Sequence, residues 1–512
     1  MSQPTNPTTP VSSMETAASN RPTESPSRLR QVRIDKLNEW RAKGVNPYPY
    51  HFEKSHSNEA LQKQYANLED GVETQDMVAV AGRVMALRNN GMFIDLQDPT
   101  GKLQLFSHKD NLPPEVLEQL KLVDIGDMVG AKGNIRRTPR GELSVKVREL
   151  TLLSKALLPL PEKYHGLTDK ETRYRQRYLD LIMNPESRET LVKRSRIISE
   201  IRRFLDNKGF MEVETPMLQS QAGGAAAKPF LTHHNALETD MVLRIAPELA
   251  LKRLIVGGIS EKVFELNRNF RNEGISPRHN PEFTMMELYQ AYADYTDMMD
   301  LTEELIVHLA NTVLGTTELQ YGEHTISLAS PWARKSMIDC VKEATGHDFS
   351  TIETDDDARN IAKSLDVFVE SYDTWGVVLE KIFEEKVEPT LIQPTHITDY
   401  PRETSPLAKV HRSNPRLVER FETRVNGWEI SNAFSELSDP LDQRARFESQ
   451  LAQRDLGDDE AHLLDEDYIT ALEYGMPPCG GLGIGIDRLI MLLTNSANIR
   501  DVIAFPTLKP LK

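Results

Sequence analysis

The chain has 512 residues and a formal net charge of −16 at pH 7, with 61 Lys and Arg against 77 Asp and Glu. It is too long for one ordinary hydrophobic core, so we expect two or three domains. The acidic balance argues only weakly against a nucleic-acid partner, because binding depends on local patches rather than on net charge. Two cysteines, Cys340 and Cys479, form no metal-like pair and no disulfide framework, which fits a reducing compartment.

Membrane and export signals are missing from the sequence. No apolar run approaches the ~20 residues that a membrane-spanning helix needs. The first residues lack the apolar core of a signal peptide and the arginines of a transit peptide. We therefore expect a soluble, cytoplasmic protein without a membrane partner. Residues 1–27 are rich in Thr, Ser, Pro and Asn and carry few apolar side chains, which predicts a disordered tail.

A helical pattern covers residues 28–43, with an apolar stripe of Leu29, Val32, Leu37 and Trp40. Arginines and lysines, including Arg33, give this helix a basic side. That side indicates either a solvated surface or a contact with RNA, and the pattern alone leaves both open.

Five short segments between residues 77 and 154 alternate apolar and polar side chains between polar turns. This pattern predicts a five-stranded barrel of the oligonucleotide-binding type. Ile94 and Leu96 alternate inward, so Phe93 points outward, as do Gln104 and Phe106 in the next segment. Exposed rings beside amides and amines can stack on bases, at ~1–3 kcal/mol per base. A single exposed Phe is commonplace, so the prediction of a base-stacking surface depends on the whole group of side chains rather than on Phe93 alone.

The segment FELNRNFRNEGISPRHNPEFTMMELY, residues 264–289, predicts two strands joined by a polar loop. Alternation puts Arg271 on one face of the first strand and Phe283, Glu287 and Tyr289 on one face of the second. The loop adds two further basic side chains, Arg278 and His279. The loop therefore places cationic side chains beside a strand face that also carries a carboxylate. Such a surface suits a ligand that has both phosphates and an amine. An ordinary amphipathic hairpin would show the same alternation.

A strong two-residue hairpin signal, Asn-Gly, stands at positions 426–427. If this turn pairs Val425 with Trp428, then Glu422 and Glu429 lie on one face of the ribbon. Two carboxylates together with phosphate oxygens and waters suit magnesium. Two solvent-exposed glutamates on an edge ribbon are the alternative.

Strict alternation beyond this turn places one group of side chains on the opposite face from Glu429. The group comprises Asn432, Phe434 and Glu436. We therefore expect a β-bulge near Ser431, which would bring both sets into one cleft.

Residues 315–390 show scattered helical patterns and no chemical motif. Near the end, GGLGIGIDRLIMLL places Arg488 in the first turn of an apolar helix. A dinucleotide-binding interpretation of its glycines fails, because the chain ends before a βαβ unit could follow.

Three segments resemble, in order, the three signature motifs of class II aminoacyl-tRNA synthetases. They are the helix and strand of residues 188–218, the segment 264–289 with Arg271, Glu273 and Phe283, and the segment around Arg488. The Met-Glu-Leu-Tyr sequence that ends the second motif at Tyr289 resembles the lysyl-tRNA synthetases of subclass IIb.

The resemblance implies an α+β fold. After the tail it predicts a helix and OB-type anticodon-binding barrel at 28–155, a linker at 156–180, and a class II catalytic domain at 181–512. That domain would have an antiparallel sheet flanked by helices, with a helical insertion at about 315–390. The family joins L-lysine to ATP, releases pyrophosphate, transfers the lysyl group to the 3′ end of tRNA(Lys), and works as a homodimer.

The resemblance also implies roles for individual residues. Catalytic roles fall to Arg271, Glu273 and Arg488. ATP contacts fall to Arg271, Arg278, His279, Phe283 and Arg488. Lysine contacts fall to Gly224, Glu248, Glu287, Tyr289, Asn432, Phe434 and Glu436. Glu422 and Glu429 would bind magnesium, with up to about three ions per subunit. Arg83, Phe93 and Gln104 would contact the anticodon. From position alone, Glu248 could equally complement a helix dipole.

Two other functions are open. A paralogue that lysylates a translation factor would lack the barrel. A non-catalytic RNA-binding protein would tend to lose Arg271, Glu429 or Arg488, and all three are present. Enzymes for aspartate and asparagine share the architecture, but an aspartate pocket needs a cation at its base. The acidic and acceptor oxygens of Glu287, Tyr289 and Glu436 match an ammonium instead.

Overall fold

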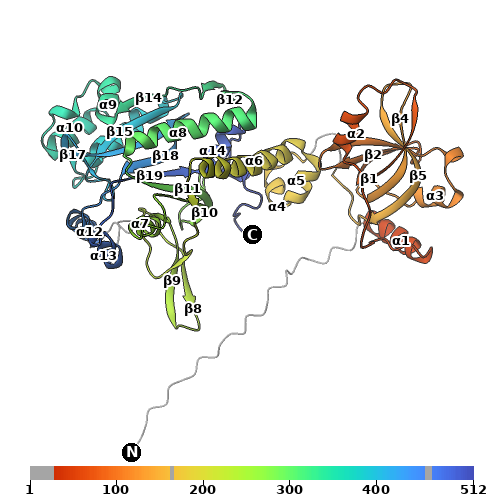
Figure 1. Ribbon diagram of the computed structural model, residues 1–512, viewed down its shortest axis with the longest axis horizontal. Helices are drawn as coiled ribbons and strands as arrows, with labels where there is room; N and C mark the ends of the chain where they lie inside the picture. The colour runs from red at the N-terminus through yellow and green to blue at the C-terminus, as the bar shows by residue number, and fades with distance from the viewer. Residues whose placement is uncertain (1–27, 162–166, 456–463, 512) are drawn as a thin grey trace, which may run out of the picture. The chain divides into compact units, whose positions relative to one another are not determined.

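A computed structural model describes residues 28–161, 167–455 and 464–511 (Figure 1). The tail predicted at residues 1–27 lies outside this range. The chain divides into two compact units, Met1–Gly166 and Leu167–Lys512. Among the described helices, none is long and apolar enough to cross a membrane.

In its described residues, the first unit is a five-stranded barrel with three α-helices. Its strands are β1 (Glu73–Arg88), β2 (Phe93–Asp98), β3 (Gly101–Phe106), β4 (Met128–Arg137) and β5 (Leu143–Ser154), and its helices are α1 (Arg28–Ala42), α2 (Asn58–Gln64) and α3 (Pro114–Leu120). The strands close in the order β1-β2-β3-β5-β4. Ile94, Leu96 and Leu105 fill the interior, while Phe93 and Gln104 lie half-buried on the outside. The predicted barrel and its alternation are confirmed.

The apolar stripe predicted for α1 is partly wrong. Leu37 and Trp40 are buried, but Leu29 and Val32 are 61% and 44% exposed. Arg33 is buried instead, and its guanidinium donates to the carbonyls of Ala156 at 3.0 Å, Leu158 at 3.0 Å and Ile125 at 2.9 Å. A guanidinium has five donors, so it can satisfy several buried carbonyls that an apolar side chain would leave unpaired.

The second unit is built on a nine-stranded sheet with the order β14-β15-β17-β18-β19-β11-β10-β6, in which β16 also pairs with β17. Its strands are β6 (Met211–Glu212), β10 (Lys262–Phe270), β11 (Glu282–Ala291), β14 (Ala333–Ser336), β15 (Thr395–Pro401), β16 (Val410–His411), β17 (Asn414–Val425), β18 (Trp428–Ser435) and β19 (Cys479–Gly485). The central pairs are antiparallel, as expected. The edge pairs β6–β10 and β14–β15 are parallel.

Smaller strands and helices complete this unit. The strands are β7 (Leu218–Gln219), β8 (Leu231–His234), β9 (Thr239–Leu243), β12 (Glu318–Tyr321) and β13 (His324–Ser327). The helices are α4 (Lys170–Arg175), α5 (Arg177–Met183), α6 (Pro185–Asn207), α7 (Glu248–Val256), α8 (Tyr295–Leu309), α9 (Met337–Thr345), α10 (Asp355–Ser364), α11 (Trp375–Lys386), α12 (Pro440–Asp455), α13 (Glu466–Glu473), α14 (Ile486–Leu493) and α15 (Ile499–Val502). The β8–β9 hairpin projects away from the sheet beside α7 (Figure 1).

The sheet separates a hydrophobic core from a polar cleft. On one face, α6, α8 and α14 pack on Met286 and Leu288 of β11 and on Phe264 of β10. On the other face, α7, α12 and α13 cover one end and leave the side chains of Glu287 and Met285 lining a pocket. This is the alternation that the sequence predicted for β11, because successive side chains of a strand point to opposite faces.

Two segments differ from their sequence-based description. Strands β12, β13 and β14 occupy the first part of the stretch expected to be helical at 315–390, and α9, α10 and α11 follow them. Helices α4 and α5 begin at Lys170 and Arg177, inside the stretch expected to be a linker, and both belong to the second unit. The prolines that suggested a linker precede these helices, at positions 159 and 161.

Candidate active site

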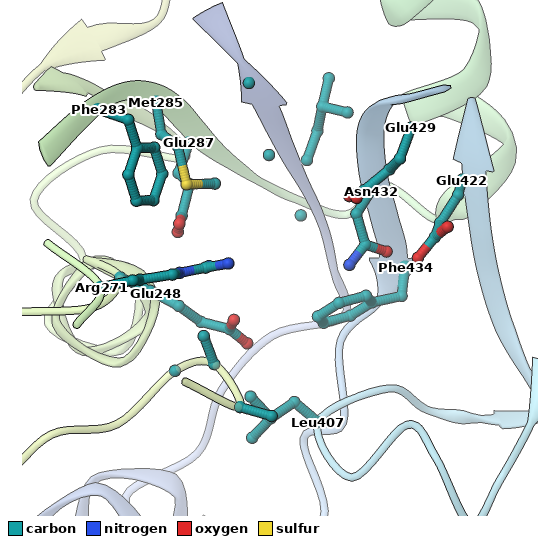
Figure 2. Close-up of a pocket in the computed structure, with 18 of the residues that line it drawn as sticks. Glu248, Arg271, Phe283, Met285, Glu287, Leu407, Glu422, Glu429, Asn432 and Phe434 are labelled. Atoms are coloured by element: carbon teal, nitrogen blue, oxygen red, sulfur yellow. The ribbon is translucent and has the colours of Figure 1, made fainter. Parts of the chain in front are cut away.

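A pocket of about 580 Å³ opens on the polar face of the sheet (Figure 2). It is lined by every residue that the sequence placed in the catalytic site of the second unit: Gly224, Glu248, Arg271, Glu273, Arg278, His279, Phe283, Glu287, Tyr289, Glu422, Glu429, Asn432, Phe434, Glu436 and Arg488. The pocket brings together segments more than 200 residues apart along the chain, from the loop before α7 to the start of α14.

Several basic side chains line the pocket. The Arg271 guanidinium lies 5.3 Å from the ring centroid of Phe283, and the two side chains lie one above the other in Figure 2. Among the described residues, Arg271 Nε has no hydrogen-bond partner although it is buried. Burial lowers the pKa of Arg271, and the nearby Glu273 opposes that shift. An arginine that lines a pocket and has an unused donor is suited to bind a phosphate or carboxylate.

Arg488 connects the loop after β10 to β18. Its Nη1 donates to Glu429 Oε2 at 3.0 Å, and its Nη2 lies 2.9 Å from His279 Nε2. Burial and the charge of Arg488 lower the pKa of His279. A neutral imidazole can accept a hydrogen bond from Arg488 on Nε2, and its Nδ1 lies 2.7 Å from the Ser276 hydroxyl.

The bulge expected near Ser431 is present. Val425 pairs with Trp428 and Thr423 pairs with Ser431, whereas Arg424 pairs with Glu429. The register shift leaves one extra residue, Ile430, on β18, and Ile430 points into the hydrophobic core.

The bulge has the consequence expected of it. Glu429 lies before the shift and Asn432, Phe434 and Glu436 lie after it, and all four line the same pocket. An extra residue in one strand changes the face to which the following side chains point.

Glu422 and Glu429 are the candidate metal ligands. Arg420 Nη2 donates to Glu422 Oε1 at 2.6 Å, and Arg424 pairs with the other oxygen of the same carboxylate. Burial would raise the pKa of Glu429, but the charges of Arg488 and the other nearby arginines hold it below its usual value. Within the described residues, no three His, Cys, Asp or Glu side chains form a metal-binding group. Two carboxylates alone are too few ligands for magnesium. They can bind it together with the phosphate oxygens of a nucleotide, as is common for magnesium sites.

Three buried carboxylates also line the pocket: Glu248, Glu287 and Glu436, which are 7%, 5% and 1% exposed. Tyr289 donates its hydroxyl to Glu287 Oε2 at 3.2 Å. Burial and the charge of Glu248 raise the pKa of Glu287 to about 8. Such a concentration of carboxylates is costly unless cations pair with it.

One cation in this region was not predicted from the sequence. Lys252, on α7, is fully buried, and its Nζ contacts Glu248 at 2.6 Å and also pairs with Glu436. The signal that could have found it is the spacing of four residues from Glu248, which places both side chains on one face of a helix. Arg420 was also missed; it donates to Asn432 Oδ1 at 3.0 Å as well as to Glu422.

The three residues predicted to contact an anticodon lie in the first unit, and none of them lines this pocket. The Phe93 ring centroid lies 5.4 Å from that of Phe106, and Arg136 lies 4.5 Å from the Phe106 ring centroid. Gln104 accepts a hydrogen bond from Ser144 Oγ at 2.9 Å. Arg83 donates to the Gly126 carbonyl at 2.8 Å, so one of its donors is already used.

Two family models match the two units separately. Residues 169–509 match tRNA synthetases class II (D, K and N). Residues 78–153 match the OB-fold nucleic acid binding domain. The chain belongs to the class II tRNA synthetases of the D, K and N group, as the three sequence motifs indicated.

Individual relatives narrow this assignment. Proteins named lysine–tRNA ligase are 56% identical in Sinorhizobium medicae, over 93% of this chain and 96% of theirs, and 55% identical in Carboxydothermus hydrogenoformans, over 94% and 98%. The protein of that name in Moorella thermoacetica is 55% identical over 95% of this chain and 99% of its own. The chain is a member of the lysine–tRNA ligase family.

Proposed function

We propose that the chain activates L-lysine with ATP, releases pyrophosphate, and transfers the lysyl group to the 3′ end of tRNA(Lys). The observation that carries this proposal is the distribution of charge in one pocket. Arg271, Arg278 and Arg488 line it together with the carboxylates of Glu287 and Glu436. Guanidinium groups suit phosphates, and carboxylates suit the ammonium groups of lysine.

Lysine is favoured over aspartate, one of the other amino acids of this family group. Aspartate would bring a carboxylate to the part of the pocket where Glu248, Glu287 and Glu436 are buried. Lys252 is fully buried and paired with two of these carboxylates, so it does not offer a free positive charge. A second carboxylate would therefore meet net negative charge.

Chemistry would proceed without a protein nucleophile. The lysine carboxylate attacks the α-phosphorus of ATP, pyrophosphate leaves, and a hydroxyl of the terminal ribose of tRNA then takes the lysyl group. Positioning and charge stabilisation carry such a reaction. We assign Arg271 to the α-phosphate and the lysine carboxylate, with Glu273 beside it. Phe283 and Arg488 hold the adenine ring, and Arg278, His279 and Arg488 contact the phosphates.

We assign the remaining contacts as follows. Glu248 and Gly224 bind the α-amino group, Asn432 helps to bind the carboxylate, and Glu287, Tyr289, Phe434 and Glu436 surround the lysine side chain. Glu422 and Glu429 would hold magnesium, which neutralises triphosphate charge when bound. Arg83, Phe93 and Gln104 contact the anticodon. We further infer a cytoplasmic homodimer.

The deciding experiment is ATP–pyrophosphate exchange with each amino acid in turn, followed by charging of total tRNA. We expect exchange with lysine alone and charging of tRNA(Lys) alone. Glu436→Gln should lower kcat/KM for lysine by about 100-fold and leave the KM for ATP almost unchanged. An exchange that depends on aspartate or asparagine, or an unaltered lysine KM in Glu436→Gln, would refute the proposal.

A further inference from the structure

Lys252 joins two carboxylates that come from distant parts of the chain. Glu248 opens α7 and Lys252 lies one turn later, while Glu436 directly follows β18. Lys252 Nζ lies 2.6 Å from Glu248 Oε1 and forms a second, closer ion pair with Glu436 Oε2. Because both carboxylates contact one nitrogen atom, neither can move far without the other.

Neighbouring groups restrict Lys252 and Glu436 further. Lys252 Nζ lies 5.8 Å from the ring centroid of Tyr289 and 5.3 Å from that of Phe434. Glu436 Oε1 lies over Gly481, where a Cβ atom would stand only 1.9 Å from it. The ammonium is thus fixed by aromatic faces, and the carboxylate is confined between the ammonium and the β19 backbone.

The charges around Lys252 agree with a resident cation. Burial alone would lower the pKa of Lys252, but Glu248 and Glu436 raise it well above its usual value, so the side chain stays charged. Two buried carboxylates, Glu248 and Glu436, thus contact one internal ammonium.

We propose that Lys252 is a positioning residue that sets the side-chain length selected by the amino-acid pocket. The inference rests on the proposed function, in which Glu248 holds the α-amino group and Glu436 the side-chain ammonium. Lys252 ties these two carboxylates together and so fixes the spacing between the sites for the two ends of the substrate. It does not touch the substrate, because its side chain is fully buried behind the carboxylates that line the pocket.

Lys252→Met tests this inference, because methionine keeps the length of the apolar stem and removes the charge. ATP–pyrophosphate exchange is measured with lysine, with ornithine, which is one methylene shorter, and with homolysine, which is one longer. We expect kcat/KM for lysine to fall by about 100-fold and the preference for lysine over either homologue to fall by about ten-fold, with the KM for ATP almost unchanged. Equal losses for all three amino acids would overturn the inference.

A matched control and a second variant keep the test decisive. Arg253, the next residue on α7, pairs with Asp465 at 2.8 Å outside the pocket. Arg253→Met should therefore leave the preference for lysine unchanged; if it weakened that preference as much as Lys252→Met does, the inference would fail.

The second variant asks whether Lys252 acts through Glu436. The fold-decrease in kcat/KM for lysine caused by Lys252→Met should be several-fold smaller in a Glu436→Gln background than in the wild type. Strictly additive effects would overturn the inference even if Lys252→Met is unstable by thermal melting. Absence of lysine-dependent exchange in the wild type would instead refute the proposed function.

Discussion

Tyr289 donates its hydroxyl to Glu287 Oε2 at 3.2 Å, which joins two alternate residues of β11 inside the amino-acid pocket. The hydrogen bond stabilises the ionised form of Glu287, yet burial and the nearby Glu248 charge raise its pKa to about 8. Near neutral pH, the empty pocket therefore holds a proton that competes with a bound ammonium.

This competition predicts a pH dependence of lysine binding. The lysine side chain stays cationic up to about pH 10, so the titrating group is Glu287, which is protonated below its raised pKa and ionised above it. The KM for lysine should fall by up to about ten-fold per unit as pH rises from about 6.5 to 8 and then level off. Exchange assays at saturating ATP measure it. Glu287→Gln should bind lysine more weakly, and its lysine KM should depend less on pH. An equally steep pH dependence in that variant would mean that a group other than Glu287 titrates.

The position of Glu429 predicts how activity depends on magnesium. Glu429 lines the pocket and faces Arg488 at 3.0 Å, so replacing it by Gln removes a hard anionic ligand without a large change in volume. Glu429→Gln should raise the magnesium concentration needed for half-maximal exchange by about ten-fold or more. Glu282→Gln is the control, because Glu282 is exposed at the start of β11 and outside the pocket. A magnesium titration that matches the wild type would remove Glu429 from the metal site.

The ring pair on the barrel predicts a separation between the two steps of the reaction. Phe93 packs on Phe106 on the outside of β2 and β3, in a unit that does not line the amino-acid pocket. Phe93→Ala should raise the KM for tRNA by about ten-fold or more, the equivalent of one lost base stack, and leave lysine-dependent exchange nearly intact. Tyr50→Ala is a control, since Tyr50 is a fully exposed ring in the same unit. If Phe93→Ala reduces exchange and charging equally, the ring does not act in tRNA binding.

Local patterns predicted the strands well because each strand has one apolar face. Met286 and Leu288 are buried in the core, so alternation alone determines that Glu287 faces the pocket. The bulge at Ile430 was also predictable, since no regular ribbon could bring Glu429 and Asn432 to the same side.

Features that depend on distant segments were not predictable from local patterns. Lys252 reads as a solvated helix residue until Glu436, more than 180 residues later, is brought beside it. Val32 matched a helical stripe, but the end of the barrel meets α1 on a face where carbonyls need a donor, and Arg33 supplies it. Tertiary contacts of this kind override periodicity.

The close approach of Glu436 to β19 predicts that Gly481 tolerates no side chain. A Cβ at position 481 would stand 1.9 Å from Glu436 Oε1 and 2.6 Å from the Tyr289 ring, so Gly481→Ala must displace the carboxylate or the ring. We expect the lysine KM to rise by about 100-fold with little change in the KM for ATP. Gly485→Ala is the matched control on the same strand, because its nearest neighbour would be 3.8 Å away. Measuring exchange across lysine concentrations for both variants, with thermal melting to show that they fold, distinguishes a displaced pocket from a damaged sheet. A Gly481→Ala enzyme with the wild-type lysine KM would mean that Glu436 does not contact the substrate from this position.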